Sequence, residues 1–382
     1  MFRARVWECY LLYSTVAAHE ILQKAHLVEP HISLMLRSEF GALALFHRAR
    51  RPPPERLTAH FIFDRWEVEK HMRLLEQYLL GLPLGTSMKG IDLTVITPMD
   101  AAPLDRVLRA IGHLACEHME VEVSEAVKDA KAPAIYAAVP RVPQLKTLSI
   151  RGCQFFSQPI LGWTLQTLKL DSLTALDIRA AELPPVDWKR FLSQITLPRL
   201  KEFSFEATVS FPMLQGFLDR HLTIRDLTLN RITSPSQVAG RPSRKPKLSG
   251  VEDVYVNTSH LSRLFSVENA PLLKKLTIAL DSGFATVINT LAVLAFHPAL
   301  RDLEFEFANS GTGLIEQLVD EFASRPMVLI RGVQSLEFTS SCATTELDQK
   351  LYVSALCFTM TSLLTLEFPR TPRQVYLRDF PM

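Results

Sequence analysis

The sequence predicts an α/β solenoid, with a curved parallel β-sheet on the inside and helices on the outside. The first observation is a six-residue frame with apolar residues at its first, fourth and sixth positions, as in Leu145-Lys-Thr-Leu-Ser-Ile150. The second is its repetition. Nine copies begin at Leu145, Leu173, Leu200, Ile224, Val251, Leu273, Leu300, Val333 and Leu363, which are 28, 27, 24, 27, 22, 27, 33 and 30 residues apart. Such a period is typical of irregular leucine-rich repeats.

Each frame predicts a short strand. Alternate side chains of a strand face opposite ways, so Leu148 and Ile150 face one side while Ser149 and Arg151 face the other. One such strand cannot bury its apolar side alone, whereas parallel stacking of many copies builds a continuous core. We therefore expect the fourth residues of the frames to be buried on adjacent parallel strands.

The first 30 residues predict a helical cap. Apolar residues recur at helical spacing from Val6 to Val28, and Pro30 ends the pattern because the residue before a proline avoids helical geometry. Two weaker strands follow at His31–Leu36 and Thr58–Phe63. Helices are predicted at Glu39–Arg50 and Trp66–Leu82.

The frame itself returns before the nine clear copies, at Met88–Leu93 and Cys116–Val121, with a helix at Pro103–His113 between them. The solenoid therefore begins well before Leu145. We predict a solenoid over residues 31–370, clearest over 143–370, followed by a C-terminal tail over 371–382.

Most later strands are followed by a helical pattern. These segments are Trp188–Ile195, Pro212–His221, Leu261–Glu268, Ala285–Phe296, Leu314–Phe322 and Leu347–Thr359. A proline two residues before the frame stops the preceding helix in four repeats. These prolines are Pro143, Pro198, Pro271 and Pro298.

Two stretches break the pattern. Leu165–Leu170 fits the frame but lies only eight residues before Leu173, so we expect two strands joined by a tight connection. Residues 233–248 contain three prolines and four basic residues and no acid, which predicts an exposed loop. This loop is a solvated linker, a nuclear localisation signal, or a phosphorylation-sensitive tether at Ser234, Ser236 or Ser243.

Composition limits the possible partners. There are 42 basic and 40 acidic residues, which gives no reason to expect nucleic acid or an anionic membrane as a partner. No apolar run approaches the 18 residues of a membrane span. Five cysteines without a CxxC pair indicate reduced thiols and a cytoplasmic or nuclear location.

A search for catalytic chemistry finds none. Cys116 lies between His113 and His118, but as a frame position it should point into the core rather than bind a metal. Gly311-Thr-Gly313 lacks the lysine and spacing of a phosphate loop. We expect no enzyme activity, no cofactor and no metal.

The outward positions of the strands are the candidate binding site. The early repeats carry arginine at the seventh position and the late repeats carry glutamates, which should gather into one acidic patch on the concave face. Tyr255 and Asn257 lie near its middle. The predicted partner-binding residues are Arg151, Arg179, Tyr255, Asn257, Glu304, Glu306, Glu337 and Glu367. The acidic patch suits a protein partner with a basic segment.

The repeats resemble the leucine-rich-repeat part of fungal F-box-type proteins. The stretches that carry the resemblance are Leu145–Cys153 and Pro198–Glu206, together with the irregular repeat length. In that family an N-terminal F-box docks onto a cullin-type ubiquitin ligase and the repeats capture the substrate. The Leu-Pro-x-Glu opening of an F-box is absent, so residues 1–30 are either a helical cap or an F-box remnant.

The resemblance and the repeats together lead to protein–protein recognition as the expected function, in the form of a substrate receptor of a ubiquitin ligase. One alternative is a scaffold or inhibitor without a ligase role. Another is a GTPase-activating protein, because such activators also exist on this repeat architecture; Arg151 or Arg179 would then supply the catalytic arginine.

Overall fold

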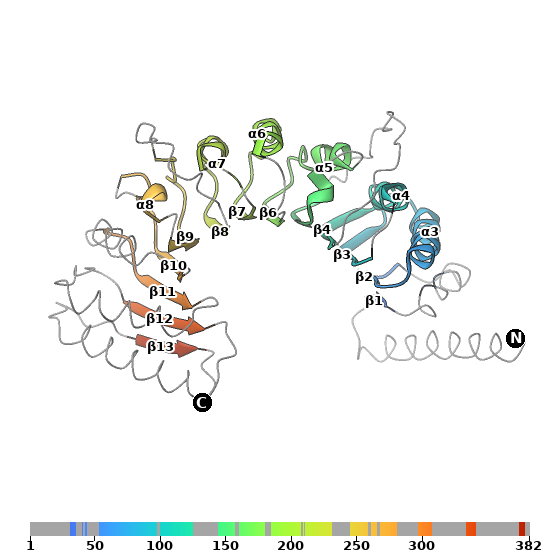
Figure 1. The fold of residues 1–382 in the computed structure, drawn as a ribbon, viewed down its shortest axis with the longest axis horizontal. Helices are drawn as coiled ribbons and strands as arrows, with labels where there is room; N and C mark the ends of the chain where they lie inside the picture. The colour runs from blue at the N-terminus through green and yellow to red at the C-terminus, as the bar shows by residue number, and fades with distance from the viewer. Residues whose placement is uncertain are drawn as a thin grey trace, which may run out of the picture. The chain divides into compact units, whose positions relative to one another are not determined.

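The computed structural model describes residues 31–35, 40, 43, 53–97, 100–124, 144–156, 160–179, 185–207, 209, 211–230, 245–258, 261–265, 268–280, 297–307, 334–340 and 374–378. The chain divides into two compact units, Met1–Arg199 and Leu200–Met382. Each unit is an α/β structure whose strands are all parallel and follow one another in sequence order (Figure 1).

The first unit pairs six strands, each with the next along the chain. They are β1 His31–Leu34, β2 Arg56–Phe61, β3 Ser87–Val95, β4 Ala115–Val123, β5 Thr147–Arg151 and β6 Ala175–Arg179. Its helical segments are α3 Arg65–Gly81, α4 Ala101–Ile111, η1 Cys153–Phe156, α5 Leu161–Thr167 and α6 Pro185–Gln194. Helices α3, α4 and α5 all lie on one side of this sheet (Figure 1).

The second unit pairs seven strands, again in sequence order. They are β7 Glu202–Glu206, β8 Asp226–Asn230, β9 Asp253–Asn257, β10 Lys275–Leu280, β11 Asp302–Phe307, β12 Ser335–Ser340 and β13 Gln374–Arg378. The helices described in this unit are α7 Phe211–Leu218 and α8 Leu261–Leu264. Strand-to-helix alternation with parallel pairing is what the repeated frame predicts.

The frame also determines the register. In both units the fourth frame residues pair with one another across neighbouring strands, as Leu148 does with Leu176 and Leu227 does with Val254. The predicted burial is confirmed for the described side chains. Leu148, Leu176, Phe203, Leu227, Val254, Leu276 and Leu303 are all buried. Among the described side chains, the apolar ladder is therefore continuous from β1 to β6 and from β7 to β11.

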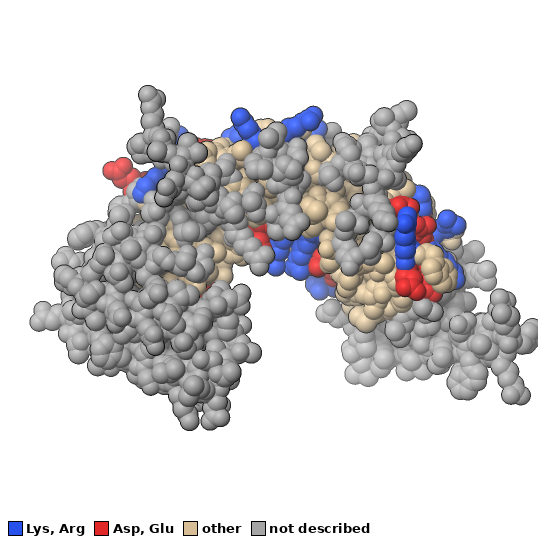
Figure 2. Space-filling view, in the orientation of Figure 1, with Lys and Arg blue, Asp and Glu red and all other residues tan. Residues whose placement is uncertain are grey.

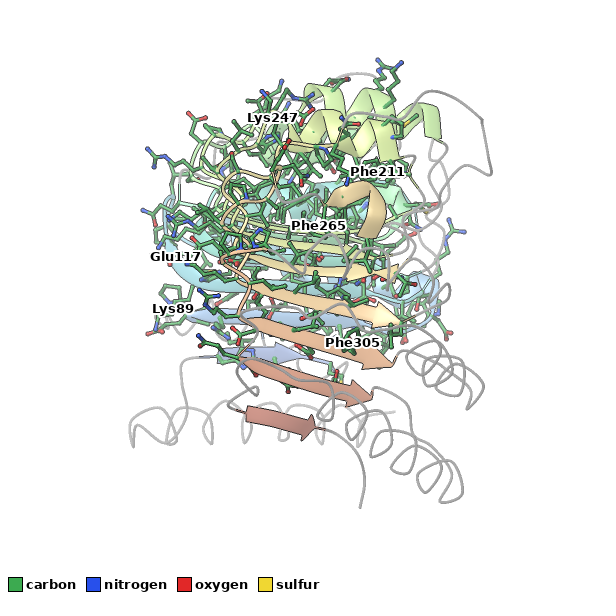
Figure 3. The ribbon with its side chains drawn as sticks, turned by 90° about the vertical axis from the view of Figure 1, so that its left-hand side faces the viewer. Lys89, Glu117, Phe211, Lys247, Phe265 and Phe305 are labelled. Atoms are coloured by element: carbon green, nitrogen blue, oxygen red, sulfur yellow. The ribbon has the colours of Figure 1, made fainter. Side chains whose placement is uncertain are left out.

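Aromatic side chains fill the space between sheet and helices. Trp188 of α6 is fully buried, and its ring lies 5.0 Å from that of Phe156. In the second unit the buried Phe211, Phe265 and Phe305 lie inside the stack, whereas Lys89 and Glu117 of the first unit lie at the edge where strands begin (Figure 3). The core thus lies on one face of each sheet.

Leu165–Leu170 does not form the predicted strand. Residues 161–167 form helix α5, because Ile160, Trp163, Thr167 and Leu168 are buried at helical spacing. The Thr164 hydroxyl also donates a hydrogen bond of 2.6 Å to the carbonyl of Phe155. The match of Leu165–Leu170 to the frame is a coincidence of leucine spacing.

The strand beside β12 also differs from the prediction. It is β13, Gln374–Arg378, which the sequence placed in the tail over residues 371–382. Several predicted segments lie outside the described residues. These are Val6–Val28, Ala285–Phe296, Leu314–Phe322, Leu347–Thr359, Leu363–Phe368, Gly311–Gly313 and most of 39–50 and 233–248. Helix α8 is shorter than the predicted Leu261–Glu268.

Candidate functional site

The side chains of the third, fifth and seventh frame positions form one surface in each unit, which we call the open face. Burial alternates along β7, β8 and β9, so that Asp253, Tyr255 and Asn257 of β9 are partly accessible while Val254 and Val256 are buried. The buried side chains face the helices. On β10 the outward Thr277 and Ala279 are buried as well. The open face is therefore the surface on which successive repeats present different side chains in register.

The open face of the second unit is acidic. Over β7–β12 its charged side chains are the acids Glu202, Glu206, Asp226, Asp253, Asp302, Glu304, Glu306 and Glu337, and the lysine Lys275. We call this surface the acidic face. Three of the four glutamates predicted for the patch lie on it; the fourth, Glu367, is outside the described residues. The neighbour of Glu337 on the far side is Tyr376 of β13.

Glu304 is the best-anchored acid of this face. Thr277 of β10 donates a hydrogen bond of 3.0 Å to its Oε2, and Thr339 of β12 donates one of 3.3 Å to its Oε1. Lys275 Nζ lies 3.2 Å from the same Oε2. Glu304 and Glu337 are direct neighbours in the register, and this lysine offsets part of their repulsion.

Tyr255 and Glu306 form a second contact on the acidic face. Their side chains are hydrogen-bonded although strand β10 lies between β9 and β11. Partial burial raises the pKa of Tyr255, and the bond to Glu306 and the negative charges of Glu304 and Glu206 raise it further. The phenol therefore stays neutral and acts as a donor. Asn257 lies beside it, in register with Ala279.

Acidic side chains of the acidic face also lie close together where the strands begin. Asp226 and Asp253 are paired in register on β8 and β9. Burial raises the pKa of Asp253, the charge of Lys275 lowers it, and repulsion from Asp226, Glu304 and Asp302 raises it, so that the net shift is upward. The pKa of Asp226 is also raised, because burial and the charge of Glu252 outweigh the charge of Arg225. The acids of this face thus interact with one another unfavourably.

The open face of the first unit is different because its arginines are neutralised locally. Arg151 of β5 reaches back to β4, where its Nη2 lies 3.0 Å from Glu120 and its Nη1 lies 3.7 Å from Glu122. Arg179 of β6 lies 3.1 Å from Asp177 on its own strand. Arg151 and Arg179 are lateral neighbours. The acids paired with them reduce the repulsion between the two guanidinium groups.

The sequence prediction missed Lys275 and the acids of the third frame position, of which Asp226, Asp253 and Asp302 are aligned with it. The signal was present, since the third position has the same parity along the strand as the fifth and seventh. Only the fifth and seventh positions were used to predict the binding site. The structure places the side chains of the third, fifth and seventh frame positions on one surface.

Charge pairs also connect the helices of the first unit. Arg106 of α4 bonds to Glu76 of α3 at 3.1 Å, and Arg65 of α3 lies 2.6 Å from Asp100. Figure 2 shows basic and acidic side chains in contact over these helices. The contacts between α3 and α4 therefore pair opposite charges.

Cys116 is buried, as its frame position predicts. Burial raises the pKa of its thiol to about 12, and its Sγ lies 2.9 Å from the carbonyl oxygen of His118. Because the thiolate is the form that binds metals and attacks electrophiles, this thiol is suited to packing. In the described part of the chain, no three His, Cys, Asp or Glu side chains gather as metal ligands would.

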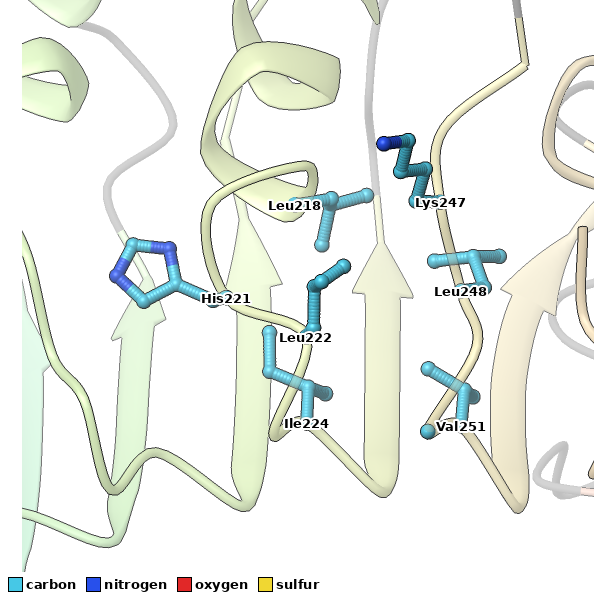
Figure 4. A pocket seen from close by; sticks show the side chains of 8 residues that line it. Leu218, His221, Leu222, Ile224, Lys247, Leu248 and Val251 are labelled. Carbon is cyan, nitrogen blue, oxygen red and sulfur yellow. The ribbon is translucent and has the colours of Figure 1, made fainter.

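A small slot lies between the end of α7 and the segment before β9 (Figure 4). Its empty volume is about 170 Å³, including space open to solvent, and leucine, isoleucine and valine side chains make up most of its lining. His221 at its border donates a hydrogen bond of 2.7 Å from Nδ1–H to the carbonyl oxygen of Phe217. The slot is a packing feature between repeats.

Comparison with protein-family models gives no match, and a search of the curated proteins finds no relative. Among the described residues, no helix combines the length and apolar character needed to cross a bilayer. The geometry of the open faces is therefore the basis for assigning a function.

Proposed function

We propose that this protein is a leucine-rich-repeat solenoid that recognises a protein partner through the open faces of its sheets. The observation that carries the proposal is the register of the strands. Side chains at equivalent frame positions, such as Thr228, Tyr255 and Thr277, form rows across β8, β9 and β10. Repeat proteins use such broad surfaces, built from many strands, to bind other proteins.

The resemblance of the repeats to fungal F-box-type proteins suggests one form of this function, a substrate receptor of a cullin-type ubiquitin ligase. The proposed function is binding of a partner protein, without a chemical reaction on that partner. Support for the ligase role comes from the resemblance alone, whereas support for recognition comes from the register and the accessible side chains of the open faces.

Site-specific photocrosslinking tests this proposal. A benzoylphenylalanine at Thr228 on the open face should crosslink a partner in a lysate, and mass spectrometry identifies it. The matched control places the same group at Gln215 of α7, on the helical side of the same unit. Crosslinking at Thr228 but not at Gln215 supports recognition through the open face. Equal crosslinking at both positions contradicts it.

The identity of the captured protein then separates the forms of the function. Ligase subunits together with a second protein support the receptor role. A small GTPase captured at Thr228 supports the activator. Any other stable partner supports a scaffold or inhibitor.

A further inference from the structure

Lys275 interrupts a row of acids on the acidic face. The third frame positions of β8, β9, β10 and β11 are aligned, so that Asp226, Asp253, Lys275 and Asp302 follow one another across the sheet. Lys275 is the single cation among the described side chains of the open face on β7–β12. The acidic face thus holds one positive charge of its own at its centre.

Lys275 occupies this place by direct contact. Its Nζ lies 3.2 Å from Glu304 Oε2. Burial lowers its pKa, but the hydrogen bond to Glu304 and the negative charges of Asp253 and Glu337 outweigh burial and raise it above the usual value. The ammonium group is therefore charged at neutral pH. Lys275 therefore shows that Glu304 holds a cation at the centre of the acidic face.

We infer that the acidic face binds a lysine- or arginine-rich segment of a partner protein, and that Lys275 competes with this segment for Glu304. The inference rests on the proposed function and adds the chemistry of the partner and an internal competitor. A cation arriving at the centre meets Asp253, Asp302 and Glu304, which are the groups that surround Lys275.

Charge complementarity selects this occupant. The acidic face over β7–β12 carries eight acids and one lysine among its described side chains, so it repels nucleic acid and anionic lipid and attracts a basic segment. Tyr255 adds an aromatic surface beside Glu306 on which a guanidinium group can stack. The first unit offers no equivalent surplus, because Arg151 and Arg179 are each paired with acids.

Lys275 is held by one acid and is about two-fifths exposed, so a partner can displace it at low cost. Exposed ion pairs are worth about 0.2–1 kcal/mol. Removing Lys275 should therefore strengthen binding of a basic segment by about 1.4- to fivefold. Removing Glu304 should weaken it by a similar factor.

The test measures binding of fluorescein-labelled decalysine to the full chain by fluorescence anisotropy, at low and at physiological salt. Lys275→Gln should bind it about 1.4- to fivefold more tightly than the wild type. Glu304→Gln should bind it more weakly. Labelled decaglutamate should not bind. Thermal unfolding of each variant checks that the fold is retained.

The matched control is Lys274→Gln, which changes the net charge by the same amount. Lys274 lies one residue before β10 and pairs with Glu252. Lys274→Gln should tighten binding less than Lys275→Gln does. Equal tightening by the two variants, or no binding of decalysine to the wild type, overturns the inference. The crosslink at Thr228 is independent of this result, so failure of the basic partner and failure of recognition through the open face are distinguishable.

Discussion

Tyr255 and Glu306 are hydrogen-bonded across an intervening strand. Tyr255 lies on β9 and Glu306 on β11, and the β10 residue in register with Glu306 is the small Ala279. The tyrosine hydroxyl reaches an acid that is two strands away. This contact joins two repeats that are not adjacent, and it holds an aromatic ring in place on the acidic face.

Replacement of this tyrosine tests the contact. Tyr255→Phe should lower the free energy of unfolding by about 1 kcal/mol, because Glu306 loses its donor while the ring is retained. Urea unfolding measures the change. Tyr78→Phe is the control, since no hydrogen bond of Tyr78 is seen among the described residues and burial alone accounts for its raised pKa. Equal losses in the two variants would show that the hydroxyl of Tyr255 is not special.

Neutralising Asp253 should stabilise the protein at neutral pH. The pKa of Asp253 is raised in the folded state, so the folded protein holds its proton more tightly than the unfolded chain does. Stability therefore falls as the pH rises from the ordinary carboxyl pKa of about 3.8 through the raised value. Asp253→Asn should raise the free energy of unfolding at pH 7 by about 0.2–1 kcal/mol, the range for like charges facing each other across strands.

The control for Asp253 is an acid of the same type in a favourable setting. Asp177 accepts a hydrogen bond of 3.1 Å from Ser149 and pairs with Arg179. Asp177→Asn should therefore lower stability while Asp253→Asn raises it, when both are measured by urea unfolding at pH 7. A loss of stability in both variants would contradict surplus negative charge around Asp253.

Arg151 should couple energetically to the preceding strand. Its guanidinium contacts Glu120 at 3.0 Å, and both side chains are about one-third exposed. A double-mutant cycle with Arg151→Gln and Glu120→Gln should give a coupling energy of about 0.5–1 kcal/mol. The pair Arg179 and Glu120, which lie two strands apart, serves as the control and should give a value near zero. If both pairs gave the same coupling energy, it would reflect long-range electrostatics and not a direct contact between Arg151 and Glu120.

The apolar ladder should dominate stability. Leu276→Ala removes a fully buried side chain at the centre of the second unit and should cost about 2–5 kcal/mol. Leu272→Ala, four residues earlier, removes a leucine that is 47% exposed and should cost less than about 1 kcal/mol. Thermal and urea unfolding of both variants measure the difference. Similar costs would mean that position 276 is not part of a packed ladder.

The repeated frame predicted most strands because it records a local property. Leu148 and Ile150 alternate with polar neighbours, and this period identifies a half-buried strand without knowledge of its partners. The same rule failed at Leu165–Leu170, where leucine spacing satisfies the frame. The burial of Trp163 and Thr167 against η1 and the neighbouring core makes this segment helical.

The charged side chains show which features follow from the strand period and which depend on tertiary contacts. That Glu304 and Glu337 face outward follows from the strand period alone. That Lys275 lies against Glu304, and that Tyr255 reaches Glu306, depends on the lateral register and on which side chains bend toward each other across β10. Alternation along one strand is a short-range property encoded in consecutive residues. Contacts between strands join residues more than 20 positions apart, and only the folded stack of repeats brings them together.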